Sequence, residues 1–335
     1  MANILVVGCG SIGRRHLRVF RANGDHFLGG VDRRDDRLDQ ADGEVKLDAK
    51  YKDYRDALND VQYDAVIIAT PPHIHTEIAQ VAAESGCHLF IEKPLAMTES
   101  GLEKLCSICE QKSIICYTAY CYRFIPSVEH LRQKLEQKVI GDVLSVRLHI
   151  SSYLPDWHPW EDYRTFYMAK KEEGGGALLD ESHGIDLIRW LFGEVDWIHA
   201  YVGNVSELEI TSDDISVMFM GMQSNAIVEA HFDLLGRTPR IGMEVIGSKG
   251  TLIWDRIDPS IRIYDAESSK WSEEKFDSDD TVQSYDLQVE HFLKCIKASS
   301  QTRNNLKDGW QTLKVLTAAL ESNKTQKVCK VEKVG

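Results

Sequence analysis

Three glycines near the start of the chain have the spacing of a dinucleotide-binding loop. Gly8, Gly10 and Gly13 fall on the pattern G-x-G-x-x-G, with Ser11 and Ile12 between the last two. The first glycine of that pattern permits a turn too tight for a Cβ atom, the second lets a pyrophosphate approach the backbone, and the third lets a helix pack closely on a strand. The free N–H groups at the start of the helix would then hold the phosphates.

The residues around the glycines favour this interpretation over an ordinary turn. An apolar run at 4–7 predicts a buried strand, apolar residues then recur with helical spacing from Ile12 to Phe20, and Asn23-Gly24 can end the helix. Because G-x-G-x-x-G by itself also occurs in loops, this strand–turn–helix context carries the prediction.

An acidic residue follows the glycine loop at the distance typical of dinucleotide-binding domains. The second predicted strand, 26–32, ends on Asp32, about 20 positions after the glycines, where an acid accepts hydrogen bonds from the ribose hydroxyls of NAD. Arg33 and Arg34 follow directly, and a guanidinium there could instead hold the 2′-phosphate of NADP. We predict NAD as the cofactor, with NADP as the alternative.

The first 120 residues alternate apolar strands with helices. Further strands are predicted at 63–70, 88–91 and 114–118, and helices at 73–85 and about 98–111. This alternation is typical of a doubly wound parallel sheet, so we predict an α/β Rossmann domain. Ligands bind beyond the carboxyl ends of such strands, where Thr70-Pro71 and Glu92-Lys93 fall.

The pattern changes after residue 120. A helix is predicted at 126–138, and closing helices at 285–298 and 309–322. Strands that follow one another across short turns are predicted at 144–150, 197–202, 215–220, 226–232, 240–246, 251–254, 261–264 and 328–331. Such a series is typical of a mostly antiparallel sheet, hence an α+β domain. We therefore predict a dinucleotide-binding domain at 1–120 and a domain for substrate binding and oligomerisation at 121–335.

The whole-chain composition excludes several kinds of partner. With 335 residues and 43% hydrophobic content the chain can form two large cores. A net charge of -13 argues against nucleic acid, and no apolar run approaches the ~20 residues of a membrane helix. The N-terminus leads directly into a strand instead of a secretion signal, so we expect a cytoplasmic protein.

Eight cysteines are expected to be free thiols of a reducing compartment. Cys106, Cys109, Cys116 and Cys121 could be mistaken for zinc ligands, but the first two lie in a predicted helix and not in a turn that presents two thiolates. We therefore predict no metal site.

Several motifs together resemble one known family. The sequence is similar to the Gfo/Idh/MocA oxidoreductases over nearly its full length. The motifs that carry the resemblance are Gly8–Gly13 with His16, Ala69-Thr70-Pro71-Pro72 with His75, Glu92-Lys93-Pro94, Gly174-Gly175-Gly176 before Asp180, Trp190-Leu191-Phe192-Gly193, and the stretch 246–252. The family implies a nicotinamide cofactor contacted by these motifs, His75 among them. It also implies a sugar or cyclitol substrate and a second domain whose open sheet joins subunits in a homodimer or homotetramer.

The resemblance also implies the catalytic residues. Lys93 would hydrogen-bond the substrate hydroxyl and the nicotinamide ribose, His183 would take the proton released on hydride transfer, and Asp180 would orient His183 or hold the substrate. The family usually has three residues between the aspartate and the histidine, whereas this chain has two, and Gly184 stands at the usual histidine position. We expect a loop one residue shorter, with His183 and Asp186 keeping their roles at the start of a helix over 185–191. The alternative is that His183 only caps this helix.

The predicted substrate contacts come from an aromatic segment at 151–167 and from Arg123 and Asp186. Tyr153, His158 and Trp160 of this segment combine flat apolar faces with polar groups, as a polyhydroxylated ring requires. The alternative is a surface loop whose aromatic side chains pack on the sheet or on a partner subunit.

The predicted activity is hydride transfer between a nicotinamide cofactor and a ring hydroxyl, or the matching ketone, of a sugar derivative. The resemblance implies that the substrate could also be an amino sugar or a nucleotide-linked N-acetylated sugar. Two other classes stay open: a glycoside hydrolase that uses NAD transiently, and a non-catalytic dinucleotide sensor.

Overall fold

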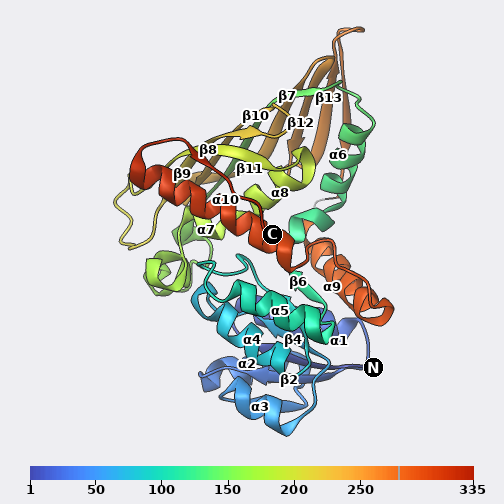
Figure 1. The fold of residues 1–335 in the computed structure, drawn as a ribbon, viewed down its shortest axis with the longest axis vertical. Coiled ribbons are helices and arrows are strands. Elements are labelled where there is room, and N and C mark those ends of the chain that lie inside the picture. Colours follow the sequence, from blue (N-terminus) through green and yellow to red (C-terminus); the bar gives the residue numbers. More distant parts are fainter. Residues whose placement is uncertain (278–279) are drawn as a thin grey trace. The chain divides into compact units, whose positions relative to one another are not determined.

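The computed structural model describes residues 1–277 and 280–335. The chain divides into two compact units (Figure 1). The first comprises Met1–Tyr120 and Tyr285–Trp310, and the second comprises Cys121–Ser284 and Gln311–Gly335.

A six-stranded parallel sheet forms the first unit. Its strands are β1 (Asn3–Val7), β2 (Phe27–Val31), β3 (Ala49–Tyr51), β4 (Ala65–Ile68), β5 (His88–Ile91) and β6 (Cys116–Thr118), in the order β3-β2-β1-β4-β5-β6. The strand order reverses between β1 and β4, and ligands bind at the carboxyl ends of strands at such a switch point. The loops after Val7 and Ile68 therefore border the expected cofactor site.

Helices connect these strands. They are α1 (Ser11–Ala22), α2 (Asp35–Val45), α3 (Tyr54–Asp60), η1 (Pro72–Ile74), α4 (His75–Glu84) and α5 (Leu102–Lys112). The predicted strands are present, whereas α2, β3 and α3 were not predicted, because these polar segments have little apolar periodicity.

A helical segment from late in the chain also belongs to the first unit. The ring of Phe292 in α9 (Asp280–Ala298) packs against that of Phe90, with centroids 5.4 Å apart. Residues 285–310 thus lie with the first unit, although the sequence assigned them to the second domain. Helical periodicity shows that a helix has an apolar face but not which core this face meets.

The second unit contains a nine-stranded sheet. Its strands are β7 (Val143–Tyr153), β8 (Val195–Gly203), β9 (Ile215–Met222), β10 (Ile227–Asp233), β11 (Leu235–Gly247), β12 (Gly250–Asp255), β13 (Ser260–Asp265), β14 (Lys270–Lys275) and β15 (Cys329–Lys330), in the order β14-β13-β12-β11-β7-β10-β9-β8-β15. All neighbours are antiparallel except β7 and β10. The two sheets confirm the predicted fold class. Only β14 was not predicted, because its sequence KWSEEK is polar and exposed.

The remaining helical elements of the second unit come before β7, between β7 and β8, and after β14 in the chain. They are η2 (Cys121–Phe124), α6 (Pro126–Glu136), η3 (Leu154–Asp156), η4 (Tyr163–Thr165), η5 (Tyr167–Ala169), η6 (Lys171–Glu173), α7 (Ala177–Asp180) and α8 (Ser182–Phe192), and α10 (Leu306–Thr325) enters the unit at Gln311.

The two faces of the nine-stranded sheet differ in character. Along β7, Leu148 and Ile150 are buried, whereas Arg147 and His149, which alternate with them, face the other side. Helix α8 covers the buried face, where a Cβ atom at Gly184 would overlap the ring of Phe232. We call the opposite side, which carries Arg147 and His149, the open face.

Among the described residues, no helix combines the length and the apolar composition that crossing a membrane requires.

Candidate active site

The glycine loop after β1 has the geometry of a phosphate cradle. Gly8 has a φ of +96°, and a Cβ atom there would lie 2.5 Å from the Ala69 carbonyl oxygen. A Cβ atom at Gly13 would overlap the Gly8 carbonyl oxygen, so α1 can start here only with glycine at both positions. At Gly10, by contrast, the nearest atom in this direction belongs to the Arg37 guanidinium, 3.8 Å away. The loop is therefore open at the second glycine, where a pyrophosphate needs access.

The first turn of α1 can bind an anion. Gly10 is the N-cap residue and supplies no capping side chain, and the turn Ser11-Ile12-Gly13 carries no charge. The first N–H groups of a helix have no partner within it, and the helix dipole favours a negative group there. These residues fit the pyrophosphate of NAD.

Asp32 is held at the edge of this loop. One carboxylate oxygen accepts from the backbone N–H of Cys9 at 2.9 Å, and the other accepts from the N–H of Arg34 at the same distance. An acid at this place, after the second strand of a Rossmann fold, is suited to accept hydrogen bonds from a ribose.

The guanidinium next to Asp32 is not one of those singled out in the sequence. Arg33 is exposed, and Nε of Arg34 donates to Asp36 at 3.0 Å. Arg37 instead approaches Asp32, with 3.9 Å between Nη1 and Oδ2. Its place in the first turn of the helix that follows Asp32 is the signal that could have identified it.

His75 links the loops after β4 and β5. Its ring is fully buried, with Nε2 2.8 Å from the Thr70 carbonyl oxygen and Nδ1 3.1 Å from that of Pro94. Burial lowers the pKa of His75, so the neutral ring donates to only one of these carbonyl oxygens. His75 therefore links the loop around Pro71 to the Lys93-Pro94 peptide, which is cis.

Lys93 follows a buried acid that is fixed by α1. His16 Nε2 lies 2.6 Å from Glu92 Oε1, and Glu92 Oε2 accepts from the N–H of Lys93 at 3.3 Å. His16 is fully buried and Glu92 nearly so. The helix of the glycine loop and the Lys93 backbone are therefore joined through Glu92.

His183 lies in the first turn of α8, which begins three residues earlier than predicted. Its ring stacks on that of Tyr122, with centroids 4.4 Å apart and an interplanar angle of 6°. Arg256 Nη1 donates to the Tyr122 hydroxyl at 2.6 Å. Because His183 is nearly buried and stacked, its ring has a defined plane, which a solvent-exposed helix cap would not require.

Asp180 ends the short helix α7 and is also buried. Its Oδ1 accepts from the Tyr167 hydroxyl at 2.5 Å. Tyr167 thus holds the carboxylate that the sequence singled out, and this tyrosine belongs to the aromatic segment.

Arg123 and Asp186, both predicted as substrate contacts, face each other. Arg123 donates from Nε and Nη2 to the two Asp186 oxygens at 2.9 and 2.7 Å. Asp186 is 0% and Arg123 4% exposed. A bidentate pair buried to this degree fixes α8 against η2, so we infer that the pair positions His183.

The aromatic segment divides into packed and exposed parts. Phe166 belongs to a small core with Leu154 and Met168, against which Trp157, Tyr163 and Tyr167 pack. The segment's predicted substrate contacts are not members of this core, although the His158 ring packs edge-on against Phe166, with centroids 5.4 Å apart. Trp160 is 75% exposed with the His158 ring 5.4 Å away, and the Tyr153 ring lies 3.6 Å below the Arg237 guanidinium.

All eight cysteines are free thiols. Burial raises the pKa of Cys109 to about 12 and that of Cys116 well above its usual value, and it also raises the pKa of Cys106. These thiols are protonated at neutral pH.

The parallel sheet, the glycine cradle and the acid after β2 define a dinucleotide-binding α/β protein with a second domain built on a large sheet. Residues 2–120 match the family model described as "Oxidoreductase family, NAD-binding Rossmann fold", and residues 128–253 match the GFO/IDH/MocA C-terminal domain. The chain belongs to the Gfo/Idh/MocA oxidoreductases, and its first domain is an NAD-binding domain.

Characterised relatives extend over different parts of the chain. A myo-inositol 2-dehydrogenase of Thermotoga maritima is 26% identical over 98% of both chains. A levoglucosan dehydrogenase of Pseudarthrobacter phenanthrenivorans is 30% identical, and this chain spans 58% of its length with 61% of its own. The solved complex of a levoglucosan dehydrogenase with NADH and levoglucosan has the same fold, with a TM-score of 0.87 and 22% identity over 99% of this chain and 100% of that one.

Proposed function

We propose that the protein is an NAD-dependent dehydrogenase that oxidises a ring CH–OH group of a sugar or cyclitol derivative, or reduces the matching ketone. The observation that carries this proposal is the likeness to myo-inositol 2-dehydrogenase over 98% of both chains. It is supported by a glycine cradle that fits a pyrophosphate and by the buried, stacked His183.

Cofactor binding is assigned to the first unit. The N–H groups at the start of α1 hold the pyrophosphate, and Asp32 accepts from the ribose hydroxyls. Bound NAD supplies the acceptor for the hydride. Thr70, Pro71 and Glu92 border the same edge of the sheet, and His75 keeps their loops in place.

Proton transfer is assigned to His183. When a carbinol carbon loses a hydride, its hydroxyl proton must be removed, and a neutral imidazole is suited to accept it. The Lys93 ammonium donates a hydrogen bond to the same oxygen and stabilises the charge that develops there. Asp180, held by Tyr167, binds a neighbouring hydroxyl or orients His183.

Substrate recognition is assigned to Tyr153, His158 and Trp160 of the aromatic segment. The exposed Trp160 offers a flat apolar surface to the C–H face of a sugar ring, and the half-buried His158 and Tyr153 offer polar atoms to its hydroxyls. Such a surface suits free sugars and cyclitols as well as amino or nucleotide-linked sugars.

We also propose that the chain self-associates through the open face of its nine-stranded sheet. Tyr201, Phe219, Ile227, Ile246 and Trp271 share this face by strand register and are 37–54% exposed. Exposed apolar residues on one side of a sheet indicate an interface. Light scattering should find a dimer or tetramer that Phe219→Asp dissociates and that Val205→Asp, at an exposed loop position, leaves intact.

The activity is tested by following the absorbance of reduced nicotinamide with NAD and a panel of sugars, cyclitols, sugar acids and nucleotide sugars. We expect net reduction with at least one ring polyol. Glycoside cleavage without net reduction would instead identify the NAD-using hydrolase, and stabilisation by NAD alone, with no response to any polyol, would identify a sensor.

A further inference from the structure

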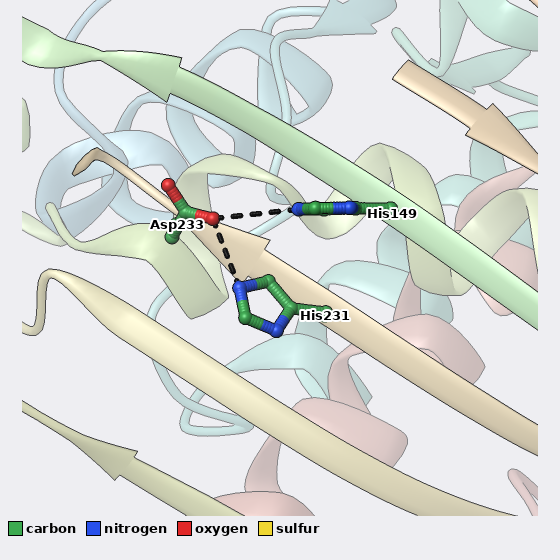
Figure 2. A group of neighbouring side chains, drawn as sticks. All are labelled: His149, His231 and Asp233. Carbon is green, nitrogen blue, oxygen red and sulfur yellow. Dashed lines mark hydrogen bonds and ion pairs between the residues drawn. The ribbon is translucent and has the colours of Figure 1, made fainter. Parts of the chain in front are cut away.

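Two histidines and an aspartate meet on the open face of the second unit's sheet. His149 of β7 and His231 of β10 stand directly opposite each other in the parallel pairing of these strands. Asp233 lies two residues after His231, hence on the same side of β10. Figure 2 shows both imidazole rings directed at one carboxylate oxygen of Asp233.

The three ligand atoms are close enough to share one ion. His231 Nε2 lies 2.9 Å and His149 Nε2 3.6 Å from Asp233 Oδ2, and all three atoms lie within 4.8 Å of one another. A tetrahedral zinc site with bonds of about 2.0–2.1 Å places its ligand atoms ~3.3 Å apart. The two observed distances lie on either side of that value.

The carboxylate is oriented by groups that do not use Oδ2. Its Oδ1 accepts from the Ser151 hydroxyl at 2.8 Å and from the N–H groups of Leu235 and Gly236 at 2.9 Å. Three donors on one oxygen hold Asp233 in place, so that Oδ2 faces the imidazoles. Surrounding hydrogen bonds of this kind orient metal ligands in proteins.

Hydrogen bonds within this cluster do not account for the position of the His149 ring. Its Nε2 is buried and has no hydrogen-bond partner among the described residues, because 3.6 Å to Asp233 is too long for a hydrogen bond. A pair formed by His231 and Asp233 needs no second imidazole directed at the same oxygen. A shared cation would satisfy all three groups.

The positive charge of Arg147 is largely offset. Arg147, two residues before His149 on the same face, lies 3.5 Å from a Glu229 oxygen and 3.4 Å from a Glu244 oxygen. Because two carboxylates offset the charge of Arg147, this arginine repels a divalent cation only weakly. The negative charge of Asp233 attracts the cation.

We propose that His149, His231 and Asp233 bind one divalent transition-metal ion, with Zn²⁺ preferred. Two imidazoles and one carboxylate suit zinc and similar borderline ions, whereas Mg²⁺ and Ca²⁺ prefer oxygen ligands. The ion would join β7 to β10, with its fourth position directed to the open face. This site was not predicted from the sequence, and its ligands are distinct from the residues assigned to hydride transfer.

The test is metal binding by the full chain after treatment with a chelator. Titration calorimetry with Zn²⁺, and the visible absorption of Co²⁺ as a probe of tetrahedral coordination, are compared for the wild type and the variants His149→Gln and His231→Gln. His199→Gln, which changes an exposed histidine of β8, is the matched control. Thermal unfolding of the chelated proteins shows whether each variant is folded.

We expect one Zn²⁺ per chain and a tetrahedral Co²⁺ spectrum. Each glutamine variant should weaken Zn²⁺ binding at least 100-fold, whereas His199→Gln should change it less than threefold. The wild type should bind Zn²⁺ less tightly at pH 5.5 than at pH 7.5, because protons compete for the imidazoles. The proposal is overturned if the wild type binds no Zn²⁺, or if both glutamine variants bind it as the wild type does. Loss of polyol oxidation would not affect this result, because the titration contains neither NAD nor substrate.

Discussion

The ring of Tyr122 lies parallel to that of His183, with centroids 4.4 Å apart. Arg256 contacts the same tyrosine twice, through a 2.6 Å hydrogen bond to the hydroxyl and through its guanidinium 4.8 Å from the ring centroid. The proposed proton acceptor is therefore held by a residue that in turn is held by an arginine from the end of β12.

Tyr122 is expected to position His183. An aromatic stack of this kind contributes about 0.5–1.5 kcal/mol, so Tyr122→Leu should lower kcat by roughly 3–10-fold and change the pH profile of kcat. Tyr122→Phe keeps the ring and should lower kcat less than threefold. Steady-state kinetics of both variants provide the measurement, with an unchanged KM for NAD as the control. Equal losses in the two variants would show that the hydroxyl, and not the stack, matters.

Lys93 is expected to contribute mainly at the reacting oxygen and little to the affinity for the cofactor. Lys93→Met should lower turnover roughly 100-fold or more, because the developing negative charge loses its donor, while the affinity for NAD stays within about threefold. Lys112→Met, at an exposed position of α5, is the matched control for kcat and for the binding titration. Unchanged turnover in Lys93→Met would remove this residue from the mechanism.

The strongest sequence signals were local ones. β5 was predicted at its observed bounds, and the glycine loop before α1 was found because its spacing and its periodicity lie within about 20 consecutive residues. The polar strand β14 was missed because an exposed edge strand needs no apolar alternation.

The parts of the site that were not predicted depend on pairing in space. Arg123 and Asp186 were each predicted as substrate contacts, and the sequence did not indicate that they also pair with each other across 63 positions. In the same way, His149 and His231 become neighbours only through the pairing of β7 with β10. Residue types at single positions do not reveal such partners.

The buried ion pair of Arg123 and Asp186 leads to a prediction about stability. Arg123→Met leaves a carboxylate with 0% exposure without its bidentate partner, which typically costs about 3–5 kcal/mol of the free energy of unfolding. The double variant Arg123→Met with Asp186→Leu removes the charge as well and should recover at least half of that loss. Urea unfolding measures both values. A cost below 1 kcal/mol for the single variant would contradict the importance of the pair.

Asp32 and Arg37 lead to a prediction about cofactor preference. The wild type should bind NADH at least tenfold more tightly than NADPH, because the Asp32 carboxylate repels a 2′-phosphate. Asp32→Ala should shift the ratio of the two dissociation constants at least tenfold toward NADPH, since Arg37 then faces the phosphate without its acid. Adding Arg37→Leu should reverse most of this shift. Tighter binding of NADPH by the wild type would show that the arginines and not Asp32 determine the preference.

Asp213 supports the glycine-rich turn before Asp180, although it was not singled out in the sequence. Its Oδ2 accepts from the N–H of Leu178 at 2.8 Å, and a Cβ atom at Gly176 would overlap its carboxylate. Burial raises the pKa of Asp213 to about 6, with a further contribution from the charge of Asp214, although the Leu178 N–H acts in the opposite direction.

The raised pKa of Asp213 predicts a pH-dependent contribution to stability. In the unfolded chain an aspartate has a pKa near 3.9, so the folded protein binds this proton more tightly and is stabilised by protonation. That contribution is complete below about pH 4 and is lost as the pH rises through about 6. Relative to Asp213→Asn, whose side chain does not titrate, the wild type should therefore lose about 2–3 kcal/mol of the free energy of unfolding between pH 4 and pH 7. Urea unfolding of both proteins across this range measures the difference and cancels the titration of all other groups. Parallel curves for the two proteins would refute a protonated Asp213 in the folded state.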